Sequence, residues 1–202
     1  ALTDVPVFVA DRAVVQGIVG FNLHRGVLAS AFRKPMPTVA ELAATATRIA
    51  VLEALNDNEN VGAISRAARA FGIDGIVISP TCTDPYYRRT VRVSMGEVLH
   101  MPIARASADD WPGALDTLHE AGFETWAMTP ADNAVDLWAT AIPERLAIVL
   151  GAEGPGLERS TLQRATRRVR IPISPDVDSL NVGHAAAITF AATSRSTTKI
   201  AE

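Results

Sequence analysis

The chain has 202 residues, of which 48% are hydrophobic and 20% are charged. This length suits one ordinary domain with some additional chain, and this composition provides for a sizeable core and argues against general disorder. The formal net charge of −3 argues against nucleic-acid binding over the whole surface, although it leaves room for a local basic patch. The single cysteine, Cys82, excludes an internal disulfide and a cysteine-rich zinc cluster.

No apolar run in the sequence is long enough to span a bilayer, and the start of the chain does not resemble a signal peptide. We therefore expect a cytoplasmic protein without membrane association. Residues 1–37 contain short apolar runs and then a proline- and charge-rich stretch typical of a linker. Thirty-odd residues cannot readily bury a core alone, so we interpret residues 1–37 as the edge of a small N-terminal domain plus linker.

From residue 38 to residue 202 the sequence alternates between strand-like and helix-like patterns. Six apolar, β-tolerant runs lie at residues 48–55, 75–79, 101–105, 123–128, 146–150 and 169–173. Helical spacing of apolar residues occurs at residues 61–71, at residues 111–122 and from residue 182 to about residue 194. Strands that alternate with helices predict an α/β fold with a mainly parallel sheet flanked by helices on both faces.

The first region that could carry chemistry follows the first predicted strand. Asn58 or Asn60 can cap the helix that begins there, and the exposed N–H groups of a helix start attract phosphate. Arg66 and Arg69 lie about one turn apart on that helix and could share a face. The alternative is a capped surface helix whose arginines are simply solvated.

The second region is a glycine loop after the strand at residues 146–150. Gly151, Gly154 and Gly156 permit backbone conformations and close approaches that a side chain would block. Their G-x-x-G-x-G spacing matches neither the dinucleotide fingerprint nor a P-loop. This spacing and the late position in the chain disfavour a nicotinamide-dependent oxidoreductase. The structural alternative is a tight turn between a strand and a helix.

The third region combines the strand end at Ile171, a proline-containing loop and the start of the last helix. Ser179 could cap that helix. Asn181 carries donors and an acceptor, as suits contact with a base edge or a hydroxyl. Nearby His184 could serve as a base, but a histidine on a helix face or in an interface is the favoured interpretation.

Together the three regions resemble the SpoU/TrmH class of the SPOUT methyltransferases, which methylate ribose 2′-hydroxyls of RNA. The resemblance covers about residues 48–195 and rests on three motifs in the family's order: Asn60-x-Gly62-x-x-x-Arg66; Leu150-Gly151-Ala152-Glu153-Gly154-x-Gly156-Leu157; and Ile171-Pro172-Ile173 with Ser179-Leu180-Asn181-Val182. It implies a C-terminal trefoil knot and a homodimer with the active site at the subunit interface. Residues 21–29 look like the end of the RNA-binding domain that precedes the catalytic domain in many members, so that residues 38–202 would form the SPOUT methyltransferase domain.

The resemblance also implies the roles of individual residues. The cofactor is S-adenosylmethionine, and the positions expected to hold or border it are Gly151, Ile171, Leu180, Thr129, Leu150, Gly154 and Asn181. The positions expected to serve catalysis or substrate placement are Arg66, Asn60, Glu153, Ser179 and Asn181. Methyl transfer from a sulfonium is an in-line displacement that requires no metal, and we expect none.

The function that follows is S-adenosylmethionine-dependent methylation of a ribose 2′-hydroxyl of structured RNA. Ribosomal RNA is the favoured substrate because the N-terminal extension resembles that of ribosomal RNA enzymes. The alternatives are a transfer RNA 2′-O-methyltransferase and a non-catalytic RNA-binding protein on the same fold. Two basic groups could contact RNA or could be solvated surface: Arg88, Arg89 and Arg92 beside Tyr86 and Tyr87, and Arg164, Arg167, Arg168 and Arg170.

Overall fold

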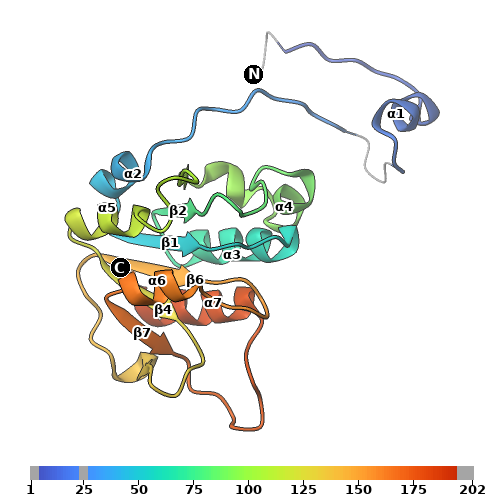
Figure 1. Ribbon diagram of the computed structural model, residues 1–202. Helices are drawn as coiled ribbons and strands as arrows, with labels where there is room; N and C mark the ends of the chain where they lie inside the picture. Colours follow the sequence, from blue (N-terminus) through green and yellow to red (C-terminus); the bar gives the residue numbers. More distant parts are fainter. Residues whose placement is uncertain (1–4, 23–26, 195–202) are drawn as a thin grey trace, which may run out of the picture. The chain divides into compact units, whose positions relative to one another are not determined.

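The computed structural model describes residues 5–22 and 27–194. The chain separates into two compact units, Ala1–Pro35 and Met36–Glu202, which are drawn together in Figure 1. In the first unit, helix α1 (Arg12–Val19) ends at Gly20, whose φ of 72° is left-handed, and none of its residues is buried. Residues 23–26, within the predicted end of an RNA-binding domain, lie outside the described residues.

The second unit contains a seven-stranded sheet in the order β3-β2-β1-β6-β4-β7-β5, and every pairing is parallel. The prediction of an α/β fold with a parallel sheet and flanking helices is therefore confirmed. Its strands are β1 (Arg48–Leu52), β2 (Gly75–Ile78), β3 (Ile103–Arg105), β4 (Glu124–Met128), β5 (Val135–Asp136), β6 (Leu146–Leu150) and β7 (Arg167–Arg170). Its helices are α2 (Val39–Thr45), α3 (Asn58–Ala70), α4 (Arg88–Val93), α5 (Ala114–Glu120), α6 (Arg159–Arg164) and α7 (Val182–Thr193), with two 3₁₀ turns, η1 (Glu97–His100) and η2 (Leu137–Ala139).

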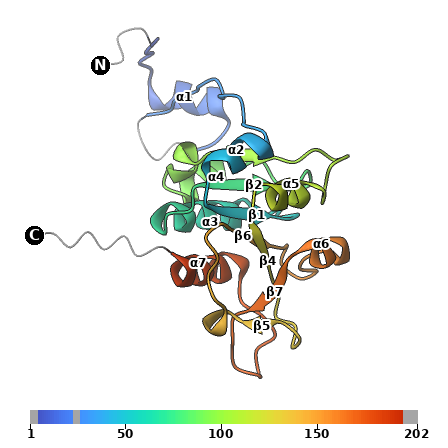
Figure 2. The ribbon, with the colours of Figure 1, turned by 90° about the vertical axis from the view of Figure 1, so that its left-hand side faces the viewer.

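The helices cover both faces of the sheet, which lies edge-on between them in Figure 2, with α3 and α7 on one side and α5 and α6 on the other. Successive side chains of a strand point to opposite faces. In β1, Ile49 and Val51 join the hydrophobic cluster that includes residues of α2 and α5. Ala50 and Leu52 join the opposite cluster, which includes Phe190 of α7. Burial on both faces explains why the central strands are continuously apolar rather than alternating.

The structure differs from the predicted elements at several places. The strand predicted at residues 169–173 is β7, Arg167–Arg170, because the chain leaves the sheet before Pro172, which cannot donate a ladder hydrogen bond. Helices α2, α4 and α6 and the two-residue strand β5 were not predicted from the sequence. In α2 a signal was present, since Thr38 and Glu41 form a capping box.

Both predicted helix caps are wrong. The N-cap of α3 is Asp57, whose side chain accepts a hydrogen bond from the Glu59 N–H at 2.9 Å, rather than Asn58 or Asn60. A carboxylate is a stronger acceptor than an amide for the N–H groups at a helix start. The N-cap of α7 is Asn181 rather than Ser179. Asn60 is thereby released from capping, and its side chain faces α7.

Gly62, in the first motif, is required by the contact between α3 and α4. A Cβ at this position would lie 2.8 Å from Val93 Cβ and 2.9 Å from the Thr90 carbonyl oxygen. Those distances are shorter than van der Waals contact, so any side chain at residue 62 forces the two helices apart. Helix packing alone therefore accounts for this motif position.

We predict that Gly62→Ala lowers the free energy of unfolding by about 1–3 kcal/mol, the usual cost of overpacking. This loss opposes the gain of about 1 kcal/mol that alanine ordinarily brings to a helix interior. Chemical denaturation of both proteins measures the difference. Gly17→Ala in α1 is the matched control, because among the described residues nothing lies within 4 Å of a Cβ there, and it should not destabilise the second unit. A Gly62→Ala protein as stable as the wild type would contradict the packing explanation.

Candidate active site

A pocket of about 430 Å³ lies where the carboxyl ends of β4, β6 and β7 meet the start of α7. Parallel strands bring these ends to one edge of the sheet, where open α/β sheets commonly bind ligands. Apolar walls are provided by Met128, Leu150 and Ile173, among others. The structure brings together at this pocket all of the residues assigned to the cofactor from the sequence: Gly151, Ile171, Leu180, Thr129, Leu150, Gly154 and Asn181.

The wall that follows β6 is a compact glycine loop over residues 151–156. The Gly156 N–H donates to the Ala152 carbonyl at 3.0 Å. Gly154 and Gly156 have φ values of 86° and 71°, a region that glycine adopts at little cost. A Cβ at Gly151 would lie 2.4 Å from the carbonyl carbon of Gly156. The unusual glycine spacing thus follows from a loop that folds back on its own backbone.

The side chain of Asn181 joins the three sequence motifs. Its Nδ2 donates to Asn60 Oδ1 at 3.0 Å and also to Glu153 Oε1. Its Oδ1 accepts from the backbone N–H groups of Gly183 at 2.9 Å and His184 at 3.2 Å. An asparagine amide has two donor hydrogens and two acceptor lone pairs, so all four are used within the protein. In this arrangement Asn181 positions the site and has no capacity left for a base edge.

The residues assigned to catalysis from the sequence fall into two groups. Glu153, Ser179 and Asn181 line the pocket, and Asn60 reaches its border through Asn181. Glu153 also accepts a hydrogen bond from the Val182 N–H at 3.4 Å, so it ties the glycine loop to the start of α7. Arg66 does not line the pocket.

Arg66 lies on the exposed surface of α3, six residues beyond Asn60. That separation corresponds to a rise of about 9 Å along the helix axis, directed away from the carboxyl edge of the sheet. It makes no hydrogen bond or ion pair within the part of the chain that the structure describes. A single copy of the chain therefore does not bring Arg66 to its own pocket. His184 is likewise exposed and does not line the pocket.

One buried acid next to the site, Glu53, was not predicted from the sequence. Glu53 follows β1 directly and is 1% exposed. Its Oε1 accepts a hydrogen bond from the Glu158 N–H, just beyond the glycine loop, at 3.1 Å. Burial raises the pKa of the Glu53 carboxyl above its ordinary value, and the nearby charge of Glu158 acts in the same direction, against smaller opposing hydrogen bonds. The available signal was a charged residue at the end of an otherwise apolar strand.

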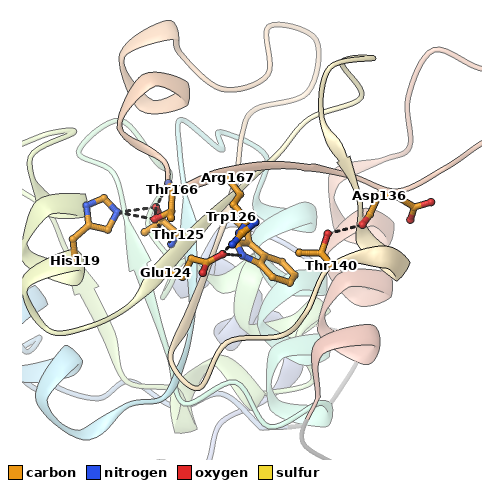
Figure 3. Close-up of polar contacts among 8 residues, drawn as sticks. All are labelled: His119, Glu124, Thr125, Trp126, Asp136, Thr140, Thr166 and Arg167. Carbon is orange, nitrogen blue, oxygen red and sulfur yellow. Dashed lines mark hydrogen bonds and ion pairs between the residues drawn. The ribbon is translucent and has the colours of Figure 1, made fainter.

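The second basic group named above is largely paired with carboxylates. Arg164 forms an ion pair with Asp116, and Arg167 forms one with Glu124. Arg170 Nη1 lies 3.6 Å from Asp132 Oδ1. Figure 3 shows the pair of Glu124 and Arg167 at the start of β4, where Glu124 also accepts from the indole of Trp126. These contacts favour the structural interpretation of this group over an RNA-binding one.

Figure 3 also shows a hydroxyl network at this amino end of β4, which is the end opposite the pocket. Thr125 Oγ1 contacts Nε2 of His119 at 2.8 Å, and the Thr166 N–H donates to the same hydroxyl at 2.9 Å. Thr125 is fully buried. The network therefore joins α5, β4 and the start of β7 without lining the pocket.

In the first basic group, Arg89 pairs with Glu59 of α3, while Tyr87, Arg88 and Arg92 are exposed. Among residues 5–22 and 27–194, no cluster of three or more potential metal ligands occurs. Within the same residues, no helix has both the length and the apolar character needed to cross a membrane.

Comparisons with known proteins agree with this architecture. Residues 47–191 match the family described as the SpoU rRNA Methylase family. A protein of Mycobacterium tuberculosis strain H37Rv, named an uncharacterized tRNA/rRNA methyltransferase, is 49% identical over 194 residues, which cover 95% of this chain and 67% of the relative. The 23S rRNA (guanosine(2553)-2′-O)-methyltransferase of Bacillus subtilis is 29% identical over 148 residues, which cover 73% of this chain and 58% of the relative.

A solved structure, the AdoMet-bound rRNA methyltransferase of Sinorhizobium meliloti, superposes with a TM-score of 0.72 at 29% identity, covering 80% of this chain and 61% of that one. This chain therefore spans about three fifths to two thirds of the length of these relatives. The family match extends over well over half of the chain and includes all three motifs and every strand of the sheet. The chain belongs to the SpoU/TrmH family of RNA methyltransferases.

Proposed function

We propose that this chain transfers a methyl group from S-adenosylmethionine to a ribose 2′-hydroxyl of RNA, with ribosomal RNA as the substrate. The observation that carries the proposal is the pocket, because the glycine loop, Ile171 and Leu180 come together there from separate parts of the chain. Its volume of about 430 Å³ is within the usual range for small-molecule sites. The cofactor named for the Sinorhizobium relative supports the same ligand here.

Ribosomal RNA is supported by the description of the family and by the Bacillus relative, which is named as a 23S rRNA 2′-O-methyltransferase. The mycobacterial relatives carry the broader name tRNA/rRNA methyltransferase, so transfer RNA is the alternative to be tested. Family membership also implies the predicted C-terminal trefoil knot.

When bound, S-adenosylmethionine supplies an activated methyl group for an in-line displacement. The work of the protein is to align the ribose oxygen and to stabilise the charge that develops on it. Arg66 is a poor proton acceptor because a guanidinium stays protonated far above neutral pH. We assign it instead to the phosphate next to the target ribose, where its charge lowers the cost of the forming alkoxide. The proton leaves through that phosphate or through water.

A homodimer completes this site. Since Arg66 lies on α3 outside the pocket of its own chain, a second copy would supply the arginine. The surface of α7 supports such an assembly, because this helix contains no aspartate, glutamate, lysine or arginine. Ala187, Ile188 and Ala191 of α7 are nevertheless partly or fully exposed. A helix that is apolar on all sides normally requires cover. Because α3 packs beside α7, a second copy that covers α7 would also lie near α3.

We predict that the wild-type protein binds S-adenosylmethionine and does not bind NAD, as isothermal titration calorimetry can measure. Gly151→Ala should weaken S-adenosylmethionine binding by at least about tenfold, because the new Cβ displaces the loop that the pocket requires preorganised. Circular dichroism provides the control for folding. Binding of NAD by the wild type, or unchanged cofactor affinity in a folded Gly151→Ala protein, would count against the proposed site.

We predict that Arg66→Ala lowers methyl-transfer turnover by about 10²-fold or more, the usual cost of removing one donor that stabilises transition-state charge, while cofactor affinity stays unchanged. Arg69→Ala is the matched control, because Arg69 lies one turn away and pairs with Glu97 instead; it should retain turnover. Near-normal turnover of Arg66→Lys would show that guanidinium geometry is not needed.

The same variants test whether the site is shared between subunits. If Arg66→Ala and Gly151→Ala chains are co-expressed, random C₂ pairing leaves roughly a quarter of the sites with both residues intact. At a cofactor concentration too low to saturate the Gly151→Ala pocket, each variant alone is much slower than the wild type, and we expect about that fraction of wild-type turnover to return in the mixture. If the mixture stays as slow as its parents while mixed dimers are detected, Arg66 does not act across the interface.

Mapping of ribose methylation in RNA from cells that lack the gene tests the substrate. We expect one 2′-O-methyl group to disappear from ribosomal RNA and to return when the wild-type gene is restored. The Arg66→Ala gene is the control and should not restore it. Loss confined to transfer RNA would identify the alternative substrate, and an unchanged methylation pattern would favour a non-catalytic RNA-binding role.

A further inference from the structure

Glu53 contacts both ends of the glycine loop. Its backbone N–H donates to the carbonyl of Leu150, the last residue of β6, at 2.9 Å. Its side-chain Oε1 accepts from the N–H of Glu158, immediately before α6, at 3.1 Å. Residues 151–157 therefore form a loop whose two ends are fastened to one residue. Glu53 does not itself line the pocket, so any effect on the ligand must pass through the loop.

The second carboxyl oxygen of Glu53 lacks a hydrogen bond. Oε2 is buried, and among the described residues it has no partner of ordinary geometry. Thr161 Oγ1, on the first turn of α6, is equally buried and equally unpartnered. The two groups are near enough that the hydroxyl opposes the rise in the pKa of the acid. An unpaired buried oxygen is costly, and an unpaired buried charge is more costly still.

The Thr161 hydroxyl has a donor hydrogen as well as acceptor lone pairs, so either protonation state of the Glu53 carboxyl suits this neighbour. We propose that Glu53 is a positioning residue that holds the glycine loop in its cofactor-binding form. This rests on the proposed function in one respect, namely that the pocket binds S-adenosylmethionine.

Burial raises the pKa of Glu53 above its ordinary value, against the hydrogen bonds from Glu158 and Thr161, which lower it, while the charge of Glu158 raises it slightly. A carboxyl whose pKa is higher in the folded state contributes stability that is complete below its ordinary pKa of 4.5. That contribution is lost as the pH rises through the folded-state pKa. Glu53→Gln has no proton to lose and should not share this dependence.

We predict that Glu53→Gln binds S-adenosylmethionine as the wild type does, because its amide retains one acceptor and one donor in nearly the same shape. Glu53→Met keeps the length of the side chain but removes both oxygens, and it should bind at least about tenfold more weakly because the loop is no longer preorganised. Calorimetry measures both affinities. In thermal unfolding, the midpoint of Glu53→Gln relative to the wild type should rise as the pH is raised above the ordinary pKa of 4.5.

Thr125→Val is the matched control. Thr125 is also a buried polar residue, at the amino end of β4 in the network of Figure 3, so its replacement should lower the thermal midpoint and leave cofactor affinity unchanged. Failure of the wild type to bind S-adenosylmethionine would refute the proposed function instead. With a binding wild type, unchanged affinity in Glu53→Met or weak affinity in Glu53→Gln overturns the role of Glu53. If Glu53→Met does not fold, the Glu53→Gln affinity decides: affinity like that of the wild type supports the role, and weak affinity overturns it.

Discussion

The hydrogen bonds of one side-chain amide, that of Asn181, hold together the carboxyl edge of the sheet, where the pocket lies. The group caps α7 through Gly183 and His184 and bonds to Asn60 and to Glu153. Three segments that are distant in sequence therefore meet at one side chain whose donors and acceptors are all satisfied. Such a network is rigid because every member is constrained by the others. The positions of the glycine loop and of the last helix are thereby coupled.

The parallel sheet determines where these coupled loops lie. Because β4, β6 and β7 end at the same edge, the loops that follow them surround a single cavity. Asn181 fixes the tip of the glycine loop from the side of α7, and Glu53 fastens its ends from the side of α6. The loop is thus held from both faces of the sheet. The surface of α3 that carries Arg66 points elsewhere, which is why the proposed mechanism takes Arg66 from a second chain.

Much of this arrangement could be predicted from the sequence. The strand at residues 146–150 was predicted with its observed bounds because its five residues are all apolar and all buried, and the motifs located the pocket wall. The N-caps were not predictable in the same way, because several neighbouring residues at the start of each helix are suitable by residue type. Only the packing of the folded chain determines that Asp57 caps α3 and that Asn181, rather than Ser179, caps α7. Short helices such as α4 and α6 have too few residues to show the helical periodicity of apolar side chains. The role of Glu53 could not be predicted because its hydrogen-bond partner, the N–H of Glu158, lies 105 residues further along the chain.

The pairing of β1 with β6 has a consequence for synthesis of the chain. In the register of the sheet Arg48 lies opposite Leu146, and Leu52 lies opposite Leu150. One edge of β1 can therefore be covered only after β6, which is about a hundred residues further along the chain, has been synthesised. Contacts between such remote segments slow folding and leave apolar strand edges exposed meanwhile. The edge of β1 that pairs with β6 therefore stays uncovered until residues 146–150 have emerged from the ribosome.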